Sequence, residues 1–323
     1  MKRFYFLIFL SYISFSACFA RATSPARVTV KPNIHSFTQG RADLRRDTII
    51  YRQEKLIVSL NIKMSENWSA NVGFDYNFSK NIPYLKPAFL TFRKDRWTVD
   101  AGIFATSELD KAMSSFWGNR FIDRVAVDKW MRVSSADLGA RVTYRWNDFI
   151  TTDVSLSSGN GYQQLREKYH PKPTFRAIIT PIRPLQLGGL IAVRKENDIV
   201  ETSFSGFAHF QPSDKWKATG EYHRQADSRF VEGQRLDIAS VYGTYYLTTW
   251  MSMMGRYDFI KSNRMNASDE NWNVQEDGQA IICGLIFRCL PTVRISVNYW
   301  NKRPSIKRID KEDWVYFCLE FKY

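Results

Sequence analysis

The sequence predicts an all-β fold, a transmembrane antiparallel β-barrel of about 16 strands. Three observations predict it. Segments of about ten residues alternate apolar and polar side chains from residue 55 to the end; no later apolar run reaches bilayer length; and short polar links alternate with longer ones. Residues 21–323 contain no evident linker, so we expect them to form a single barrel domain.

The first twenty residues predict a signal peptide that directs export. Lys2 and Arg3 form a positive segment, residues 4–15 are apolar, and small side chains precede a cut after Ala20. Cleavage after Ala22 and a lipoprotein box at residues 16–18 are alternatives. The apolar run is shorter than the ~20 residues of a spanning helix. An exported chain without a later spanning helix is a secreted soluble protein or a closed barrel in the cell outer membrane.

The alternation is clearest in residues 68–78, 138–146 and 293–300, where every second side chain is apolar. A soluble β-sandwich alternates as well, but here the apolar faces carry aromatic residues at the strand ends. This placement is typical of the interfacial girdles of membrane barrels and favours a lipid-facing band. The aromatic residues concerned are Trp68, Phe78, Trp97, Trp146, Trp216, Tyr257 and Phe321.

Sixteen segments fit the strand period, although 14 or 18 strands are also compatible. The first is the least regular, because residues 21–54 alternate poorly. Short links are expected in the periplasm and longer ones outside, which places both chain ends in the periplasm. The predicted strands are 27–37, 55–63, 66–78, 85–94, 96–106, 136–146, 149–158, 173–182, 185–194, 199–210, 214–224, 237–247, 250–260, 278–289, 292–301 and 313–323. The predicted longer links are 38–54, 79–84, 107–134, 159–172, 195–198, 225–236, 261–276 and 302–312.

The last ten residues place Val315, Phe317, Leu319, Phe321 and Tyr323 on one face, with an aromatic residue at the end. This pattern looks like the terminal-strand signal that the barrel-assembly machinery binds, which makes that machinery a predicted partner. The other interpretation is an ordinary last strand of a β protein.

The chain is basic, with 46 Lys and Arg against 32 Asp and Glu. The cations are dispersed and no nucleic-acid motif is present, so we predict no nucleic-acid partner; contact with outer-membrane lipid is the alternative use of such charges. Three cysteines follow the predicted signal, Cys283, Cys289 and Cys318, without the spacing of a metal site. We therefore predict free thiols, no metal site and no cofactor.

Several segments resemble the phosphate-selective porin O/P-like family of outer-membrane proteins. They are residues 85–92, 115–122, 135–139, 240–245 and 255–259, which are spread over most of the mature chain in a fitting order. The resemblance implies a sixteen-stranded porin, usually a homotrimer, with one loop folded into the pore. It does not imply phosphate selectivity, because no phosphate-binding ladder can be matched residue by residue.

Strand parity predicts which charged side chains face the interior. Basic residues slightly outnumber acidic ones there, which favours anions over cations. The alternative is that these charges pair across neighbouring strands and only hold the wall in shape. The lumen-lining candidates are Arg93, Arg141, Arg145, Arg176, Arg194, Arg256, Arg288, Arg294, Asp75 and Asp258.

The link at 107–134 is the best functional candidate, because a loop of that length usually folds onto something. Its aromatic residues can pack on the inner wall while its charged residues narrow the pore. The alternative is an external loop with a solvated charged face. The constriction candidates are Arg120, Arg124, Lys129, Asp123 and Trp117.

These features favour passive diffusion of small hydrophilic solutes or anions through an outer-membrane porin. One alternative is a non-conducting structural or adhesion barrel. Another is a barrel enzyme, for which His209 and His223 on predicted interior faces would be the candidates. No nucleophile motif accompanies either histidine, so we predict no catalytic residues.

Overall fold

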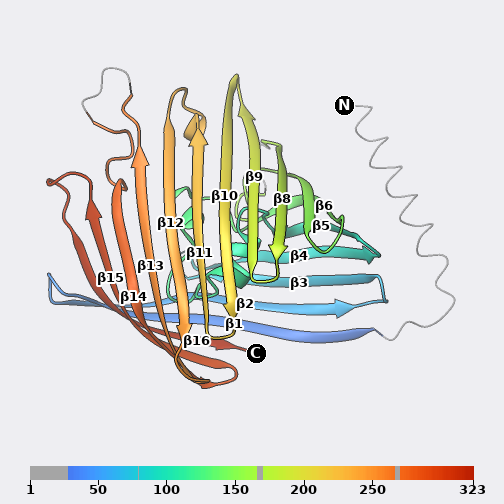
Figure 1. Ribbon diagram of the computed structural model, residues 1–323, viewed down its shortest axis with the longest axis horizontal. Helices are drawn as coiled ribbons and strands as arrows, with labels where there is room; N and C mark the ends of the chain where they lie inside the picture. Colours follow the sequence, from blue (N-terminus) through green and yellow to red (C-terminus); the bar gives the residue numbers. More distant parts are fainter. Residues whose placement is uncertain (1–27, 79, 166–169, 266–269) are drawn as a thin grey trace.

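The computed structural model describes residues 28–323 except 79, 166–169 and 266–269, and the predicted signal peptide at residues 1–20 lies outside this part (Figure 1). The strands are β1 (Thr29–Asp43), β2 (Thr48–Lys63), β3 (Trp68–Asn77), β4 (Ile82–Lys94), β5 (Trp97–Ala105), β6 (Ala136–Arg145), β7 (Ile150–Ser157), β8 (Lys172–Ile182), β9 (Leu185–Glu196), β10 (Ile199–Ser213), β11 (Trp216–Ala226), β12 (Arg235–Tyr246), β13 (Met251–Ser262), β14 (Gly278–Leu290), β15 (Val293–Pro304) and β16 (Glu312–Lys322). Three short helical segments are η1 (Ala112–Phe116), α2 (Ala126–Trp130) and η2 (Ser228–Phe230).

The strands form one closed barrel in which each strand pairs with its neighbours in the sequence, and β1 pairs with β16. Every pairing is antiparallel in the described residues, as in His35 opposite Lys322 at the closure and Trp97 opposite Tyr144 between β5 and β6. This confirms the predicted fold class. Each of the sixteen predicted segments overlaps one observed strand, in the same order.

The predicted long link at 38–54 is wrong. β1 continues to Asp43 and β2 begins at Thr48, so only residues 44–47 form the turn. The register shifts between Phe37 and Thr38, where β2 carries one extra residue. Such a bulge interrupts the period-two pattern, which is why the strand continuation is hidden in the sequence.

The outer surface of the barrel is apolar and the inner surface is polar, as alternation along each strand requires. On β3, Phe74 is 55% exposed on the outside while Asp75 is buried inside; on β7, Val154 is 57% exposed and Asp153 is buried. In the described part of the chain, no helix has the length and apolar character needed to cross a membrane. The exposed apolar surface belongs to the strands.

The links differ between the two ends of the barrel. One end has only short turns, such as residues 95–96 and 183–184, while the other has longer loops, including 158–171 and 263–277. Thr29 lies opposite Lys63 and Phe321 opposite Val293, so β1 begins and β16 ends at the short-turn end. This is the arrangement expected for an even number of strands.

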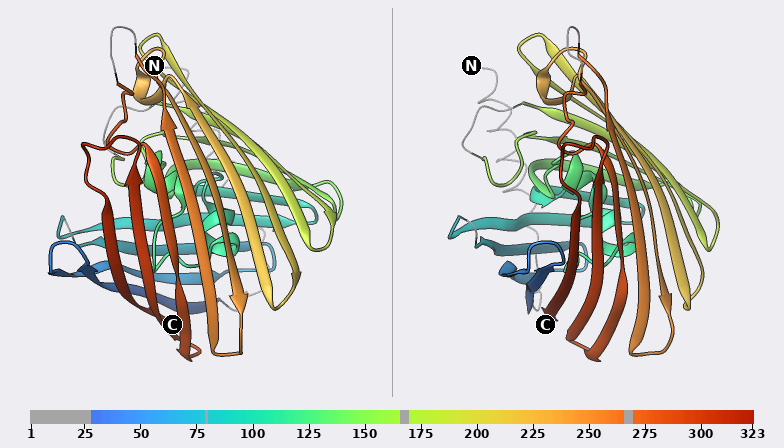
Figure 2. Two further views of the ribbon diagram at one scale, coloured as in Figure 1. Left: turned by 60° about the vertical axis from the view of Figure 1, so that its left-hand side comes forward. Right: turned by 90° about the vertical axis from the view of Figure 1, so that its left-hand side faces the viewer.

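The link between β5 and β6, residues 106–135, lies inside the barrel, and we call it the inner loop. Figure 2 shows it in green, with η1 and α2, between the blue strands and the orange wall. Its apolar side chains form the main buried cluster together with inner-wall residues of β12–β16 and β1. The largest apolar core of the protein therefore attaches a loop to one side of the interior.

Candidate pore constriction

The inner loop begins at an ion cluster on β6–β8. Asp110 accepts hydrogen bonds from Arg141, whose Nη1 lies 3.0 Å from Oδ2, and from Arg176. Arg176 also donates to Asp153 at 2.7 Å, and Ser107 Oγ donates to the same carboxylate at 2.7 Å. Two guanidiniums held by carboxylates fix the first turn of the loop against the wall, because charge-assisted bonds of this kind are short and directional.

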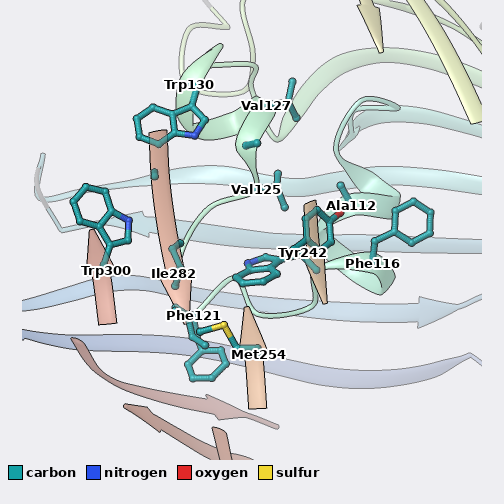
Figure 3. Packing of buried hydrophobic residues seen from close by; sticks show 14 of the residues in the cluster. Ala112, Phe116, Phe121, Val125, Val127, Trp130, Tyr242, Met254, Ile282 and Trp300 are labelled. Carbon is teal, nitrogen blue, oxygen red and sulfur yellow. The ribbon is translucent and has the colours of Figure 1, made fainter. Parts of the chain in front are cut away.

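The middle of the loop packs on apolar residues of the opposite wall (Figure 3). Trp117 lies edge-on to Tyr242, with ring centroids 5.5 Å apart, and Phe121 and Met254 pack in the same cluster. Phe116 stacks on His209 at 4.3 Å. Burial of several large side chains provides most of the attraction between loop and wall, at roughly 1.5–3 kcal/mol for each side chain taken out of water.

Polar bonds fix the position of the same segment. Gln39 Nε2 donates to the backbone carbonyls of Phe121 and Ile122 at 2.8 Å each. Trp130 Nε1 donates to Asp258 Oδ2 at 2.8 Å. Since Gln39 lies on β1 and Asp258 on β13, these bonds attach the loop to the wall opposite β6–β8, and the loop crosses the interior between the two sides.

Four of the five predicted constriction residues, Arg120, Asp123, Arg124 and Lys129, line a cavity of about 880 Å³ on the long-loop side of the inner loop. The fifth, Trp117, is 1% exposed and lies in the apolar cluster behind this surface. The sequence predicts that Trp117 helps to narrow the pore. In the structure its indole is buried and anchors the loop to the wall.

Asp123 and Lys129 form an ion pair of 2.5 Å at this surface. Burial by itself raises the pKa of Asp123, but the charges of Lys129 and Arg256 outweigh it and hold that pKa below its usual range. Burial lowers the pKa of Lys129, and the carboxylate of Asp123 offsets only part of this. Each member of the pair therefore favours the charged form of the other.

The wall across this cavity carries a second charged group, formed by the predicted residue Asp75 and two lysines that the sequence analysis does not include. Asp75 on β3 pairs with Lys55 Nζ at 2.8 Å, accepts a hydrogen bond from Tyr162 at 2.8 Å, and lies 3.6 Å from Lys86 Nζ. Lys86 also donates to Ser135 Oγ at 2.5 Å, at the end of the inner loop. Asp75 is one of the predicted lumen-lining residues, and the structure surrounds it with cations.

Strand alternation predicts the inward direction of Lys55 but not that of Lys86. Lys55 has the same parity as the polar residues Ser59 and Asn61, so alternation points it inward. Lys86 lies at a bulge, because Gly73 on β3 stands opposite two residues of β4, Lys86 and Pro87. The extra residue reverses the parity of β4, and its local signals are Gly73 and Pro87, residue types that favour bulges within strands.

A second cavity, of about 1170 Å³, lies on the short-turn side of the inner loop. Asp110 and Lys111 of the loop line it together with wall residues of β1–β9, and it shares no lining residue with the first cavity. The inner loop thus lies between two large polar spaces inside one barrel.

The remaining lumen candidates all occupy inward-facing positions. Arg93, Arg141 and Arg176 line the cavity of 1170 Å³. Arg145 and Arg288 lie at the exposed short-turn end, opposite Thr151 and Arg294 respectively. Five of the arginine candidates pair with carboxylates, which helps to hold the wall in shape: Arg141 with Asp100, Arg176 with Asp153, Arg194 with Glu201, Arg256 with Asp258 and Arg294 with Glu320.

His209 and His223, the histidines that the enzyme alternative invokes, lie behind the inner loop. His223 Nδ1 lies 2.8 Å from Ser205 Oγ, and its Nε2 lies 3.3 Å from Glu221. This order of groups is that of an activated serine, but all three are buried and the adjoining cavity measures about 20 Å³. Such a space holds about one water molecule, too little for an ester or peptide substrate.

Comparison with known proteins supports the architecture. No family model and no curated protein matches the chain. Among solved structures, it is similar to the outer membrane channel DcaP of Acinetobacter baumannii, with 13% identity, a TM-score of 0.69 and coverage of 93% of this chain and 99% of that one. It is also similar to Salmonella typhi OmpF in complex with daunomycin (10% identity, TM-score 0.71, 91% and 97%) and to the anion-selective porin from Comamonas acidovorans (7%, 0.68, 92% and 100%). At these identities the likeness establishes the porin barrel fold.

Proposed function

We propose that this protein is an outer-membrane porin through which small hydrophilic solutes diffuse passively, with the inner loop as its constriction. One observation carries the proposal: polar cavities of about 1170 and 880 Å³ lie on the two sides of the inner loop, inside a barrel whose exterior is apolar. A water-filled interior and a lipid-facing exterior are what a diffusion pore requires. Solutes must pass the loop to move between the two spaces.

The charges along this path support a weak preference for anions. The cavity on the long-loop side is lined by eight cationic side chains and five anionic ones: Arg41, Arg52, Lys55, Lys80, Arg120, Arg124, Lys129 and Arg132 against Glu54, Asp75, Asp123, Asp128 and Glu276. The other cavity has six cations and three anions: Lys31, Lys63, Arg93, Lys111, Arg141 and Arg176 against Glu66, Asp100 and Asp110. A positive lining lowers the barrier for anions and raises it for cations.

The test is the reversal potential across a planar bilayer in asymmetric salt. Wild type should conduct in steps and favour anions, and Arg120→Glu/Arg124→Glu should shift the reversal potential toward cation preference. The matched control, Lys307→Glu/Lys311→Glu, makes the same charge change on the exposed 305–311 loop and should shift it much less. A protein that gives no current steps is a non-conducting barrel. Equal shifts of the reversal potential in both variants would show that Arg120 and Arg124 do not lie at the constriction.

We propose export by the signal peptide at residues 1–20, insertion by the barrel-assembly machinery, and a homotrimer as the assembled state. Membership of the phosphate-selective porin O/P-like family rests on the sequence resemblance. The absence of catalysis is supported by the small space beside Ser205, His223 and Glu221.

A further inference from the structure

We propose that an outward-facing group of basic residues at the long-loop end of β11–β15 binds the phosphate of a membrane lipid headgroup. The group consists of Arg224, Arg235, Lys261 and Arg303, and we call it the outer basic belt. The proposal rests on the membrane placement in the proposed function and goes beyond it, because it concerns the outer surface of the barrel and not its pore.

The position of these side chains follows from strand alternation. On β11, Tyr222 is 37% exposed outside while His223 is buried inside, so Arg224 points outward. Arg224 lies opposite Asp237, and Asp237 lies opposite Lys261, which puts the three on one row across β11, β12 and β13. Since facing residues in a sheet share the same side, Lys261 also points outward.

One carboxylate holds two of the cations in place. Arg224 Nε lies 2.6 Å from Asp237 Oδ1, Arg235 Nε lies 3.2 Å from Oδ2, and the hydroxyl of Tyr222 donates to Oδ1 at 2.6 Å. Both arginines contact Asp237 through Nε. The guanidinium of Arg224 also lies over the ring of Tyr222, 5.8 Å from its centroid. A guanidinium held in this way through Nε can present its Nη edge to a phosphate.

The other edge of the surface repeats this arrangement. The hydroxyl of Tyr299 on β15 donates to Asp313 Oδ1 at 2.7 Å, and Arg45 Nε lies 2.5 Å from Asp313 Oδ2. Lys261 and Arg303 lie between the two tyrosine–aspartate–arginine groups, and both are exposed. Along this arc the outward cations exceed the two carboxylates, so the surface carries a net positive charge.

The belt adjoins the apolar band directly. One row below Arg224 and Lys261 lie Tyr222 and Phe259, both exposed on the outside, and Val241 follows at 60% exposure. Strands β2–β7 differ, because their described outward positions near the same end carry no charge: Ile49, Tyr51, Leu85, Leu138 and Leu156 are all exposed there. Cations at the edge of an apolar band lie at the level of lipid headgroups, where anionic lipids attract them.

The test measures lipid retention in the intact mature protein. Purified protein in detergent micelles is mixed with phosphatidic acid or phosphatidylcholine, and bound lipid is counted by native mass spectrometry. Wild type should retain phosphatidic acid over phosphatidylcholine. Arg224→Gln/Lys261→Gln/Arg303→Gln should lower that retention by roughly ten-fold or more, on the scale expected for three basic residues at a membrane surface.

The control Lys94→Gln/Arg183→Gln/Lys215→Gln removes the same charge from the short-turn end and should leave retention unchanged. Equal losses in both variants would reduce the belt to nonspecific charge and overturn the proposal, as would equal retention of both lipids by wild type. A changed oligomeric state with lipid retention intact would make the belt a protein interface. Bilayer conductance of the belt variant should equal that of wild type, so failure here and failure of the porin proposal are separable.

Discussion

The two sides of the barrel interior differ in what covers them. On β12–β16 and β1, the inner wall carries Ile238, Met254 and Ile282, and the inner loop packs over them. On β2–β8, the inner wall carries charged and polar residues, such as Lys55 and Asp100, that face the two cavities. One side is therefore a protein core and the other is a hydrated surface, although both belong to one continuous sheet.

The difference shows what positions the constriction. An apolar inner wall would be costly if it faced water, so the loop and the apolar wall stabilise each other by mutual burial. The hydrated wall needs no cover, because its charges pair with one another. We therefore expect the pore to lie beside β2–β8. The same kind of substitution should have different effects on stability and conductance when it is made on one wall or the other.

The largest effect should come from the anchor of the loop. Trp117→Ala removes a fully buried indole from the covered wall and should lower the free energy of unfolding by about 3–5 kcal/mol. It should also raise single-channel conductance and its noise, since the loop loses its main contact. The urea midpoint in detergent micelles and bilayer recording measure both. Trp216→Ala, on the lipid-facing surface, should leave conductance unchanged; a loosened pore in that control would contradict the comparison.

The same substitution on each wall gives the next largest difference. Asp258→Asn leaves Arg256 without its charge partner at a site where both side chains are 1% exposed, and should cost about 3 kcal/mol. Asp100→Asn breaks the pair with Arg141 on the hydrated wall and should cost less, about 1 kcal/mol, because Arg141 keeps Asp110 as a second carboxylate partner. Urea midpoints compare the two directly. Equal costs would mean that both walls are equally buried.

A smaller effect is expected on selectivity. Lys55→Gln/Lys86→Gln removes two cations from the hydrated wall opposite Arg120, and should lower the anion-to-cation permeability ratio roughly two- to five-fold, the scale of a unit charge a few ångström from an ion in water. Reversal potentials in asymmetric salt measure this ratio. As a control, Arg288→Gln at the exposed short-turn end should change it less. An unchanged ratio in the double variant would place the ion path elsewhere.

The smallest effect concerns pH. The pKa of Lys129 is already lowered by burial, and Asp123 is the charge that partly restores it. In Asp123→Asn the ammonium should therefore lose its proton at a lower pH than in wild type, and anion preference should decline at a lower pH as the solution is made more alkaline. In wild type the carboxylate stabilises loop docking above its unfolded pKa, and this contribution is lost only as the pH falls through the lower folded pKa. Identical pH profiles would show that Lys129 is outside the ion path.

The sequence was sufficient for the architecture and only partly for the site. Alternation and link length are local patterns, so the sixteen strands and the inner-loop candidates Arg120 and Arg124 follow from them. Strict alternation misses Lys86 because a bulge reverses its parity, and Gly73 and Pro87 are the local signals of that bulge. Trp117 was placed in the right loop, but whether an aromatic residue faces water or a wall depends on the opposite strand. Tertiary contacts decide such cases.

The pairing of β1 with β16 has a consequence for how the barrel forms. The other adjacent strand pairs join segments that follow one another along the chain, whereas His35 and Glu320 meet across 285 positions, with Ile34 and Tyr323 exchanging backbone bonds of 2.9 Å. Closing a long segment costs more chain entropy than closing a hairpin. The other fifteen strand pairs can therefore form before the barrel closes, whereas the β1–β16 pair requires the last strand. We expect formation of the β1–β16 pair to limit the rate of folding.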